Sequence, residues 1–300
     1  MNPNKQHLDQ WTKGIVYEVA FWNNVCRWDR TFQSTMQWSH LGGPISLEGF
    51  NAQDFLVAQP HPVVLDVGCG MSYATGNFIE RDGMLTPIEI HYVDPLAAYF
   101  NQIAQRHHRQ LPEVEFGMME HLSAFFPQQD VSMVVIQNAL DHSANPIKGI
   151  IEALHTVRTG GVVYLNHHPN EAETEQYKGF HQYNICLEDQ QLVIWNKQER
   201  QVINDIISDF ATINVWQQSD TRHVIAVIRK TADIPQDLLT AKLEIQELCK
   251  NVMSIQALSQ NVGRTLRQQF RYWLFNCIQF FAQSLTYENK MRLKQLIKQR

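Results

Sequence analysis

An aspartate and two glycines form the first group of residues whose spacing could do chemistry. Asp66 lies in the aliphatic run 62–67, and Gly68 and Gly70 follow it directly. Glycines allow positive φ angles and a close approach of the backbone to a ligand. A turn at the end of a buried strand points its backbone N–H groups at whatever lies above the strand. The spacing therefore predicts a cofactor site at this turn.

The residues around the turn disfavour NAD. The turn begins like the dinucleotide fingerprint G-x-G-x-x-G, but Tyr73 stands at the place of the third glycine. A carboxylate at Asp66 would repel a pyrophosphate, whereas it can accept hydrogen bonds from an ammonium group. Asp94, which follows the next aliphatic run, can bind both hydroxyls of a ribose in either kind of cofactor.

A second group of candidates lies in the polar stretch 166–184, which follows a later aliphatic run. Its His, Asn, Glu, Tyr and Gln side chains suit a polyhydroxylated acceptor such as a sugar. Removal of a hydroxyl proton needs a base, and histidine is the usual one. The candidate bases are His142, His167 and His181, and the candidate acceptor-binding residues are Asp141, His168, Asn170, Glu171 and Tyr177.

Other interpretations of these polar residues stay open. The stretch 166–184 could be a surface loop whose histidines have no role. His167, Glu171 and His181 could bind a divalent metal, but their spacing fits no known ligand template, so no metal is expected. For His142, a local hydrogen bond is as compatible with the sequence as a catalytic role.

The elements that must position these residues follow an α/β pattern. Short β-branched runs alternate with helical patterns from residue 62 to about 167, which predicts a parallel sheet with crossover helices. The glycine-rich turn is expected to lead directly into a helix. Asn145 and Pro146 predict the start of another helix, as N-cap and first residue. The expected strands are 62–67, 88–93, 113–116, 131–136 and 161–166.

The order of elements changes after residue 167. Runs at 192–195, 211–216 and 223–228 predict further strands, and 199–209 has a helical pattern. The turn at Ser219 is so short that the last two strands must be antiparallel. The sequence therefore predicts a mostly parallel sheet that ends in an antiparallel hairpin.

Three motifs resemble those of class I S-adenosylmethionine (AdoMet)-dependent methyltransferases over residues 60–230: VVLDVGCG, VDP and SMVVIQNALDHSANPIKGIIEALHTVRTGGVVYLNHH. The resemblance implies a Rossmann-like seven-stranded sheet with a reversed last strand, and AdoMet as cofactor. It also implies that Asp66 and the glycine turn bind the methionine moiety and that Asp94 binds the ribose. The expected cofactor contacts are Asp66, Gly68, Cys69, Gly70, Asp94, Pro95, Met119, Glu120 and Asn138.

One loop departs from the family pattern. Many members have an Asp in the loop that contacts the adenine, whereas this chain has Met118, Met119 and Glu120 there. Glu120 or a backbone amide could replace the Asp. The stretch 166–184 resembles segments of bacterial methyltransferases associated with surface-polysaccharide synthesis. We therefore expect O-methylation of a sugar or glycan; the alternative is a methyltransferase-like scaffold with weak catalysis that acts through its C-terminal helices.

The domain organisation expected from composition has three parts. Residues 1–59 are rich in aromatics and are expected to form a helical lid or substrate cap, 60–231 the methyltransferase domain with an insert at 167–197, and 232–300 a helical region. Between 266 and 285 apolar residues recur at helical spacing. Residues 264–300 contain eight Lys or Arg and one acid, Glu288. Dimerisation or peripheral contact with anionic lipid is expected of such a helix.

Bulk properties exclude several classes of protein. The formal charge of −5 argues against a general nucleic-acid binder. Five cysteines without CxxC spacing favour reduced thiols over disulfides or a zinc site. The N-terminus has no apolar core typical of a signal peptide, and no apolar run is long enough for a spanning helix. A cytoplasmic enzyme with a small-molecule or glycan acceptor is expected.

Overall fold

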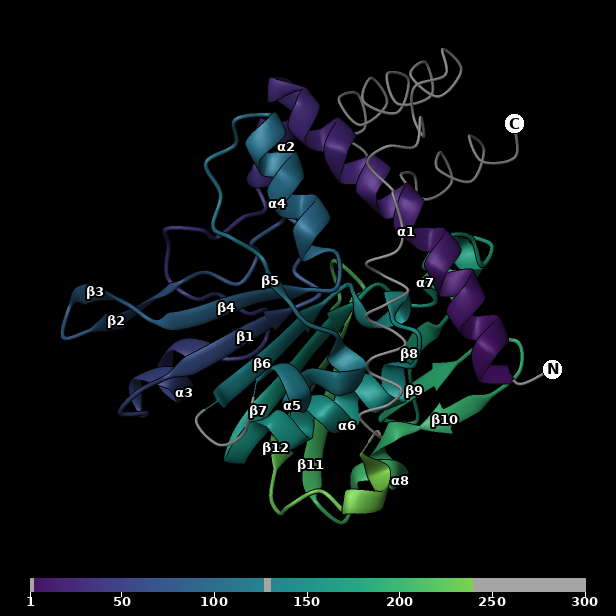
Figure 1. Cartoon of the computed structure of the whole chain (residues 1–300). Helices are drawn as coiled ribbons and strands as arrows, with labels where there is room; N and C mark the ends of the chain where they lie inside the picture. The colour runs from purple at the N-terminus through teal and green to yellow at the C-terminus, as the bar shows by residue number, and fades with distance from the viewer. Residues whose placement is uncertain (1–2, 127–130, 240–300) are drawn as a thin grey trace.

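The structure is a computed structural model that describes residues 3–126 and 131–239 (Figure 1). The expectations for the basic C-terminal helices, including oligomerisation and lipid contact, lie outside these residues. No described helix is long and apolar enough to cross a membrane.

A seven-stranded sheet forms the centre of the molecule, in the order β11-β12-β7-β6-β1-β4-β5 (Figure 1). Strand β12 is antiparallel to both of its neighbours, and the pairs from β7 to β5 are parallel. The prediction of a mostly parallel sheet with one reversed strand is confirmed. The strands are β1 (Val63–Val67), β4 (Glu89–Asp94), β5 (Glu115–Phe116), β6 (Val131–Gln137), β7 (Val157–His167), β11 (Ala211–Gln217) and β12 (Val224–Lys230).

Alternating side chains of the central strands fill apolar cores on both faces of the sheet. In β6, Val134 and Ile136 pack toward α6 (Pro146–Thr156), while Met133 and Val135 pack toward α3 (Ala52–Val57) and the loop before it. Both faces of a parallel sheet need such cover. The near-continuous aliphatic runs of the sequence follow from this burial.

Helix α6 begins where the sequence predicts. The Asn145 side chain accepts a hydrogen bond from the backbone N–H of Lys148 at 3.1 Å, and Pro146 occupies the first turn. The following strand, β7, begins at Val157, four residues before the expected start, because the chain turns directly from the helix into the sheet.

The expected helix after the glycine-rich turn is absent, and this prediction was wrong. A loop leads instead into a hairpin of β2 (Phe78–Arg81) and β3 (Met84–Pro87). Asp82 and Gly83 both have positive φ angles, 53° and 74°, as a type I′ hairpin turn requires. The dipeptide Asp-Gly between two short strand-forming runs is a hairpin signal that the helical interpretation overlooked.

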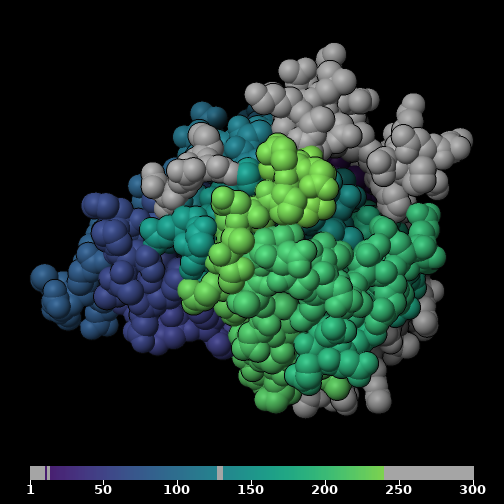
Figure 2. Space-filling model, turned by 90° about the horizontal axis from the view of Figure 1, so that it is seen from below, coloured from purple at the N-terminus to yellow at the C-terminus, as the bar shows by residue number. Residues whose placement is uncertain are grey.

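The insert after β7 folds as a small antiparallel sheet in the order β10-β9-β8. Its elements are α7 (Glu171–Thr174), β8 (Asn184–Glu188), β9 (Gln191–Trp195) and β10 (Arg200–Val202), followed by α8 (Ile203–Ile207). The expected helix 199–209 is thus shortened to α8 at its centre. In Figure 2 this part of the chain, in green, lies on the side of the molecule opposite the β2–β3 hairpin, in blue.

The N-terminal residues form α1 (Pro3–Arg27), α2 (Asp29–Met36) and, after a loop, α3. Helix α1 packs on α4 (Ala97–Arg106) through a core that includes Ile15, Val19 and Phe100. Near its start, Trp11 Nε1 donates a hydrogen bond to the carbonyl of His142 at 2.9 Å. The long helix therefore lies across the carboxyl ends of the sheet (Figure 1).

Asn145→Ala tests the cap of α6. Loss of an N-cap hydrogen bond is expected to lower the free energy of unfolding by about 1 kcal/mol. Urea denaturation measures the change, and Asn145→Ser, which keeps a capping oxygen, should recover most of it. Equal stability of the alanine variant and the wild type would show that the cap does not matter.

Candidate active site

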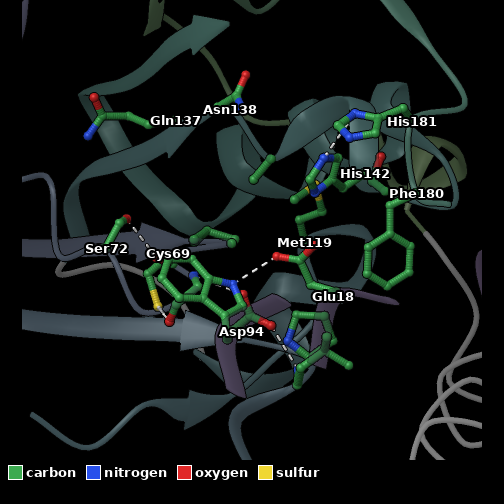
Figure 3. Close-up of a pocket in the computed structure, with 18 of the residues that line it drawn as sticks. Glu18, Cys69, Ser72, Asp94, Met119, Gln137, Asn138, His142, Phe180 and His181 are labelled. Atoms are coloured by element: carbon green, nitrogen blue, oxygen red, sulfur yellow. Dashed lines mark hydrogen bonds between the residues drawn. The ribbon is translucent and has the colours of Figure 1, made fainter. Parts of the chain in front are cut away.

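A cavity of about 460 Å³ lies at the carboxyl ends of β1, β4, β6 and β7, under α1 (Figure 3). Each strand is followed by a loop that contributes to the wall, which is where open parallel sheets bind their ligands. The expected cofactor residues among its lining are Gly68, Cys69, Gly70, Asp94, Pro95, Met119, Glu120 and Asn138. Of the expected acceptor-side residues, His142, Glu171 and His181 line it.

Asp94 connects the glycine turn to the end of β4. Its carboxylate accepts hydrogen bonds from the backbone N–H of Gly70 at 3.1 Å and from that of Leu96 at 2.8 Å. Burial raises the pKa of Asp94 to about 7, although these two hydrogen bonds act in the opposite direction. The carboxyl group is thus held in place at the cavity and titrates near neutral pH.

The two glycines of the turn are required by space as well as by conformation. Gly68 and Gly70 have φ angles of 70° and 54°. A Cβ at 68 would lie 2.4 Å from the Cβ of Ala139, and one at 70 would lie 2.8 Å from the indole of Trp22. A larger residue at either position would displace a wall of the cavity.

Asp66 does not line the cavity, contrary to the role expected for it. Because neighbouring side chains of a strand point to opposite faces, Asp66 shares the face of Val64, away from that of Val67, which lines the cavity. Its carboxylate accepts a hydrogen bond from Thr75 Oγ1 at 2.7 Å, and Thr75 Oγ1 accepts one from Gln137 at 3.3 Å. Burial raises the pKa of Asp66 to about 6.

Tyr73, at the place of a third glycine, is a core residue with 1% of its surface exposed. Its φ angle is 50°, and its hydroxyl donates a hydrogen bond to the carbonyl of Pro112 at 2.8 Å. The ring packs edge-on against Tyr92. A core side chain therefore stands where a dinucleotide site has its third glycine.

Glu120 is fixed at the start of α6. Its carboxylate accepts hydrogen bonds from the backbone N–H groups of Ala144 at 2.7 Å and Asn145 at 3.2 Å. These contacts connect the short helix η1 (Met119–His121) to the loop after η2 (Leu140–His142). Glu120 therefore shapes this end of the cavity through the backbone as well as lining it.

At the end of the cavity away from the glycine turn, where Figure 3 shows His142 and His181, Asp141 lies buried beneath these two histidines. His181 Nδ1 is 2.8 Å from Asp141 Oδ2, and His142 Nε2 is 3.6 Å from the same oxygen. The two histidine nitrogens are 3.2 Å apart. Burial acts to raise the pKa of Asp141, but His142 and His181 outweigh it and lower this pKa. Burial acts to lower the pKa of His181, and its hydrogen bond to Asp141 raises it instead.

Five of the residues expected to act on the acceptor lie outside the cavity lining: Asp141, which lies beneath two lining histidines, and His167, His168, Asn170 and Tyr177. His167 is 1% exposed, neither of its ring nitrogens has a hydrogen-bond partner among the described residues, and burial lowers its pKa to about 3. His168 packs edge-on against His223 at 4.2 Å. Asn170 precedes α7 with a φ of 51°, and the Tyr177 hydroxyl accepts a hydrogen bond from Asn184. His167 is thus not brought together with Glu171 and His181.

Helix α1 supplies residues that the sequence analysis missed. Glu18 and Trp22 are one turn apart and are joined by a hydrogen bond of 2.8 Å from the indole to the carboxylate (Figure 3). The recurrence of Trp11, Glu18 and Trp22 on one face of a helix was visible in the sequence. The sequence did not show that this face of the helix lines the site. Helix α1 lines the cavity with Trp11, Glu18, Phe21 and Trp22.

No family model and no curated protein matches the chain. Solved structures match at low identity. The CurJ carbon methyltransferase is 12% identical, with 58% of this chain and half of that chain covered, at a TM-score of 0.37. An S-adenosylmethionine-dependent methyltransferase from Clostridium acetobutylicum is 9% identical over 60% and 91% of the two chains, also at 0.37.

A SAM-dependent methyltransferase from Aquifex aeolicus is 12% identical over 60% of this chain and 87% of that chain, again at a TM-score of 0.37. The strand order and the reversed β12 are those of the chain itself, and they agree with the Rossmann-like sheet expected from the motifs.

Thr75→Val tests the hydrogen bond that holds Asp66. A hydrogen bond to a charged group contributes about 1.5–3 kcal/mol and one to a neutral group about 0.5–1.5 kcal/mol. Because the pKa of Asp66 is raised to about 6, Asp66 is ionised at pH 8 and mostly protonated at pH 5. The variant should therefore lose more stability at pH 8 than at pH 5.

Urea denaturation at the two pH values measures the loss. Thr212→Val, at an exposed position of β11, is the matched control and should cost little at either pH. A loss that is equal at pH 5 and pH 8 would show that Asp66 does not titrate in this range.

Proposed function

We propose that the protein transfers a methyl group from AdoMet to a hydroxyl group of a sugar or glycan. The observation that carries this proposal is one cavity with two different ends. One end has the glycine turn and Asp94, and the other has two histidines above a buried Asp141. Such a cavity can hold a nucleoside cofactor beside an acceptor whose proton must be removed.

The residues at the first end fit AdoMet, which supplies an electrophilic methyl group on a sulfonium when bound. The cavity volume lies within the range of cofactor sites. Asp94 would bind the ribose hydroxyls, Met119 and Glu120 would flank the adenine, and Asn138 would lie next to the reacting centre. Because Asp66 faces Thr75, we assign the positively charged methionine end to Glu18, whose carboxylate lines the cavity next to Asp94.

The second end fits a neutral polyhydroxylated acceptor. Trp11 and Phe180, whose ring centroids are 5.6 Å apart, form an apolar wall against which the C–H face of a sugar ring can pack. In the cluster as it stands, His142 is the base that takes the hydroxyl proton, with His181 and Asp141 behind it. Methyl transfer requires the acceptor oxygen and the methyl carbon to be about 3–3.5 Å apart and aligned, so positioning by these walls is the main catalytic contribution.

The division into an N-terminal cap, a methyltransferase domain and a C-terminal helical region belongs to this proposal, as does a cytoplasmic location. Helix α1 supports the cap because it covers the cavity and is tied to His142 through Trp11. A non-catalytic scaffold is the second candidate. The sequestered Asp66 and the missing helix after the turn favour it, since both weaken the usual cofactor contacts.

Binding of S-adenosylhomocysteine tests the cofactor end. Asp94→Asn and Glu18→Gln should each weaken binding by about tenfold, or ~1.4 kcal/mol. Glu80→Gln, at an exposed position of β2, should leave it unchanged. Isothermal titration calorimetry measures the three affinities. Unchanged binding in both cavity variants would remove the assignment of this end to the cofactor.

The affinity should also depend on pH through Asp94. Its pKa is raised to about 7, so protonation as the pH falls from 8 to 6 removes the negative charge that accepts the ribose hydroxyls. The ionisable groups that act on it are Glu18 and Asp66. Binding should weaken toward pH 6 in the wild type and much less in Asp94→Asn. Parallel pH profiles of the two proteins would contradict this.

Turnover tests the acceptor end. The protein is incubated with methyl-labelled AdoMet and the glycan and small-molecule fractions of its source cells, and labelled products are identified. His142→Ala should lower the rate by about 100-fold or more, in the range of general-base catalysis, with S-adenosylhomocysteine affinity near that of the wild type. His61→Ala, on the exposed surface, is the control. Full activity of His142→Ala would remove the base assignment.

A further inference from the structure

Three donor atoms converge at the acceptor end of the cavity. Asp141 Oδ2, His142 Nε2 and His181 Nδ1 are separated by 2.8, 3.2 and 3.6 Å. Zinc bonds of 2.0–2.1 Å in a tetrahedral site place neighbouring ligand atoms about 3.3 Å apart. The three separations are distributed around this value. We propose that Asp141, His142 and His181 form a binding site for a divalent transition metal, with Zn²⁺ as the best fit.

The donor set itself favours zinc over harder cations. Two imidazole nitrogens and one carboxylate oxygen are the ligands of a three-residue zinc site that keeps its fourth position open. Magnesium and calcium prefer oxygen ligands. His142 and His181 line the cavity and Asp141 lies beneath them, so the open position faces the cavity.

The hydrogen bonds within the cluster leave its donor atoms incompletely satisfied. His181 Nδ1 is within hydrogen-bond distance of both Asp141 Oδ2 and His142 Nε2, yet it has one proton to donate. Asp141 Oδ1 is buried and has no hydrogen-bond partner among the described residues. A cation between the three side chains would engage the lone pairs of Asp141 Oδ2, His142 Nε2 and His181 Nδ1 at once.

The surroundings also suit a cation. Glu18 and Glu171 line the same cavity, and both act electrostatically on His181. Within the described part of the chain, no Lys or Arg lines the cavity, so no fixed positive side chain competes for the site. The carboxylates of Glu171 and Asp141 at this end of the cavity, with that of Glu18 nearby, are negative charges that a divalent ion would neutralise.

The backbone fixes two of the ligands from both sides. The carbonyl of His142 accepts the Trp11 indole N–H, and the backbone N–H of His142 donates to Ala139 at 3.0 Å. The carbonyl of Asp141 accepts a hydrogen bond from the backbone N–H of Gln182 at 3.3 Å, which ties the loop of His181 to that of Asp141. Ligands held this way need little rearrangement to bind an ion.

The consequence for catalysis rests on the proposed function, whereas the binding does not. Zinc lowers the pKa of a bound water to about 7 and would act likewise on an acceptor hydroxyl. With the lone pairs of His142 and His181 occupied, the ion would take over the activation that the histidine base provides in its absence, and the hydroxyl proton would pass to water. The histidine nitrogens that would bind zinc are thus those of the proposed base and its partner, His142 and His181.

Metal binding to the full chain, stripped with a chelator and free of AdoMet, tests the proposal. Equilibrium dialysis should find one tightly bound Zn²⁺ per chain, and Co²⁺ should show the visible absorption of a tetrahedral nitrogen and oxygen site. His142→Gln and His181→Gln should each weaken binding by about 100-fold or more, which exceeds the effect of changing a residue that only supports a ligand. His168→Gln and His61→Gln are matched controls that should bind like the wild type.

Thermal unfolding separates loss of a ligand from loss of the fold. Zinc should raise the melting temperature of the wild type and of both controls, and should leave those of the His142 and His181 variants unchanged. Absence of one-to-one binding in the wild type, or equal binding in all variants, would overturn the proposal. Since S-adenosylhomocysteine binding is measured separately, failure of the metal site and failure of the methyltransferase assignment are distinguishable.

Discussion

The buried carboxylate of Asp94 is the contact on which the geometry of the cavity depends. It accepts backbone N–H groups from the glycine turn after β1 and from the loop after its own strand, β4. Two neighbouring strand ends are thereby fixed to each other through one side chain. The cost of burying this charge appears as a pKa of about 7 for Asp94. A ligand whose hydroxyl groups donate hydrogen bonds to the carboxylate would offset that cost.

A second buried aspartate, Asp141, follows β6 in the short helix η2. Its side chain holds His181, which comes from the loop after β7. The cavity is therefore bounded by two buried acids, each joining the ends of different strands. Helix α1 covers both, because Trp22 packs over Gly70 and Trp11 binds the carbonyl of His142. A single N-terminal helix can thus couple the two ends.

Much of this arrangement follows from local sequence. The aliphatic runs, the Asn145 cap and the short turn at Ser219 determine strands, helix and hairpin through contacts within a few residues, and these predictions are confirmed. The expected role of Asp66 depended on which face of the sheet its side chain points to. That face is covered by the loop that carries Thr75, and this packing cannot be read from the local sequence. A helical lid from residues 1–59 was expected, but its individual contacts, such as that of Trp11 with His142, depend on packing across more than a hundred residues, which no local pattern contains.

The central claim is that the cavity binds the nucleoside and methionine parts of AdoMet rather than a dinucleotide. Calorimetric titration of the wild-type protein with S-adenosylhomocysteine and, in parallel, with NAD⁺ tests it most directly. The account predicts saturable one-to-one binding of S-adenosylhomocysteine and no heat of binding with NAD⁺. Binding of NAD⁺, or of neither ligand, would contradict it.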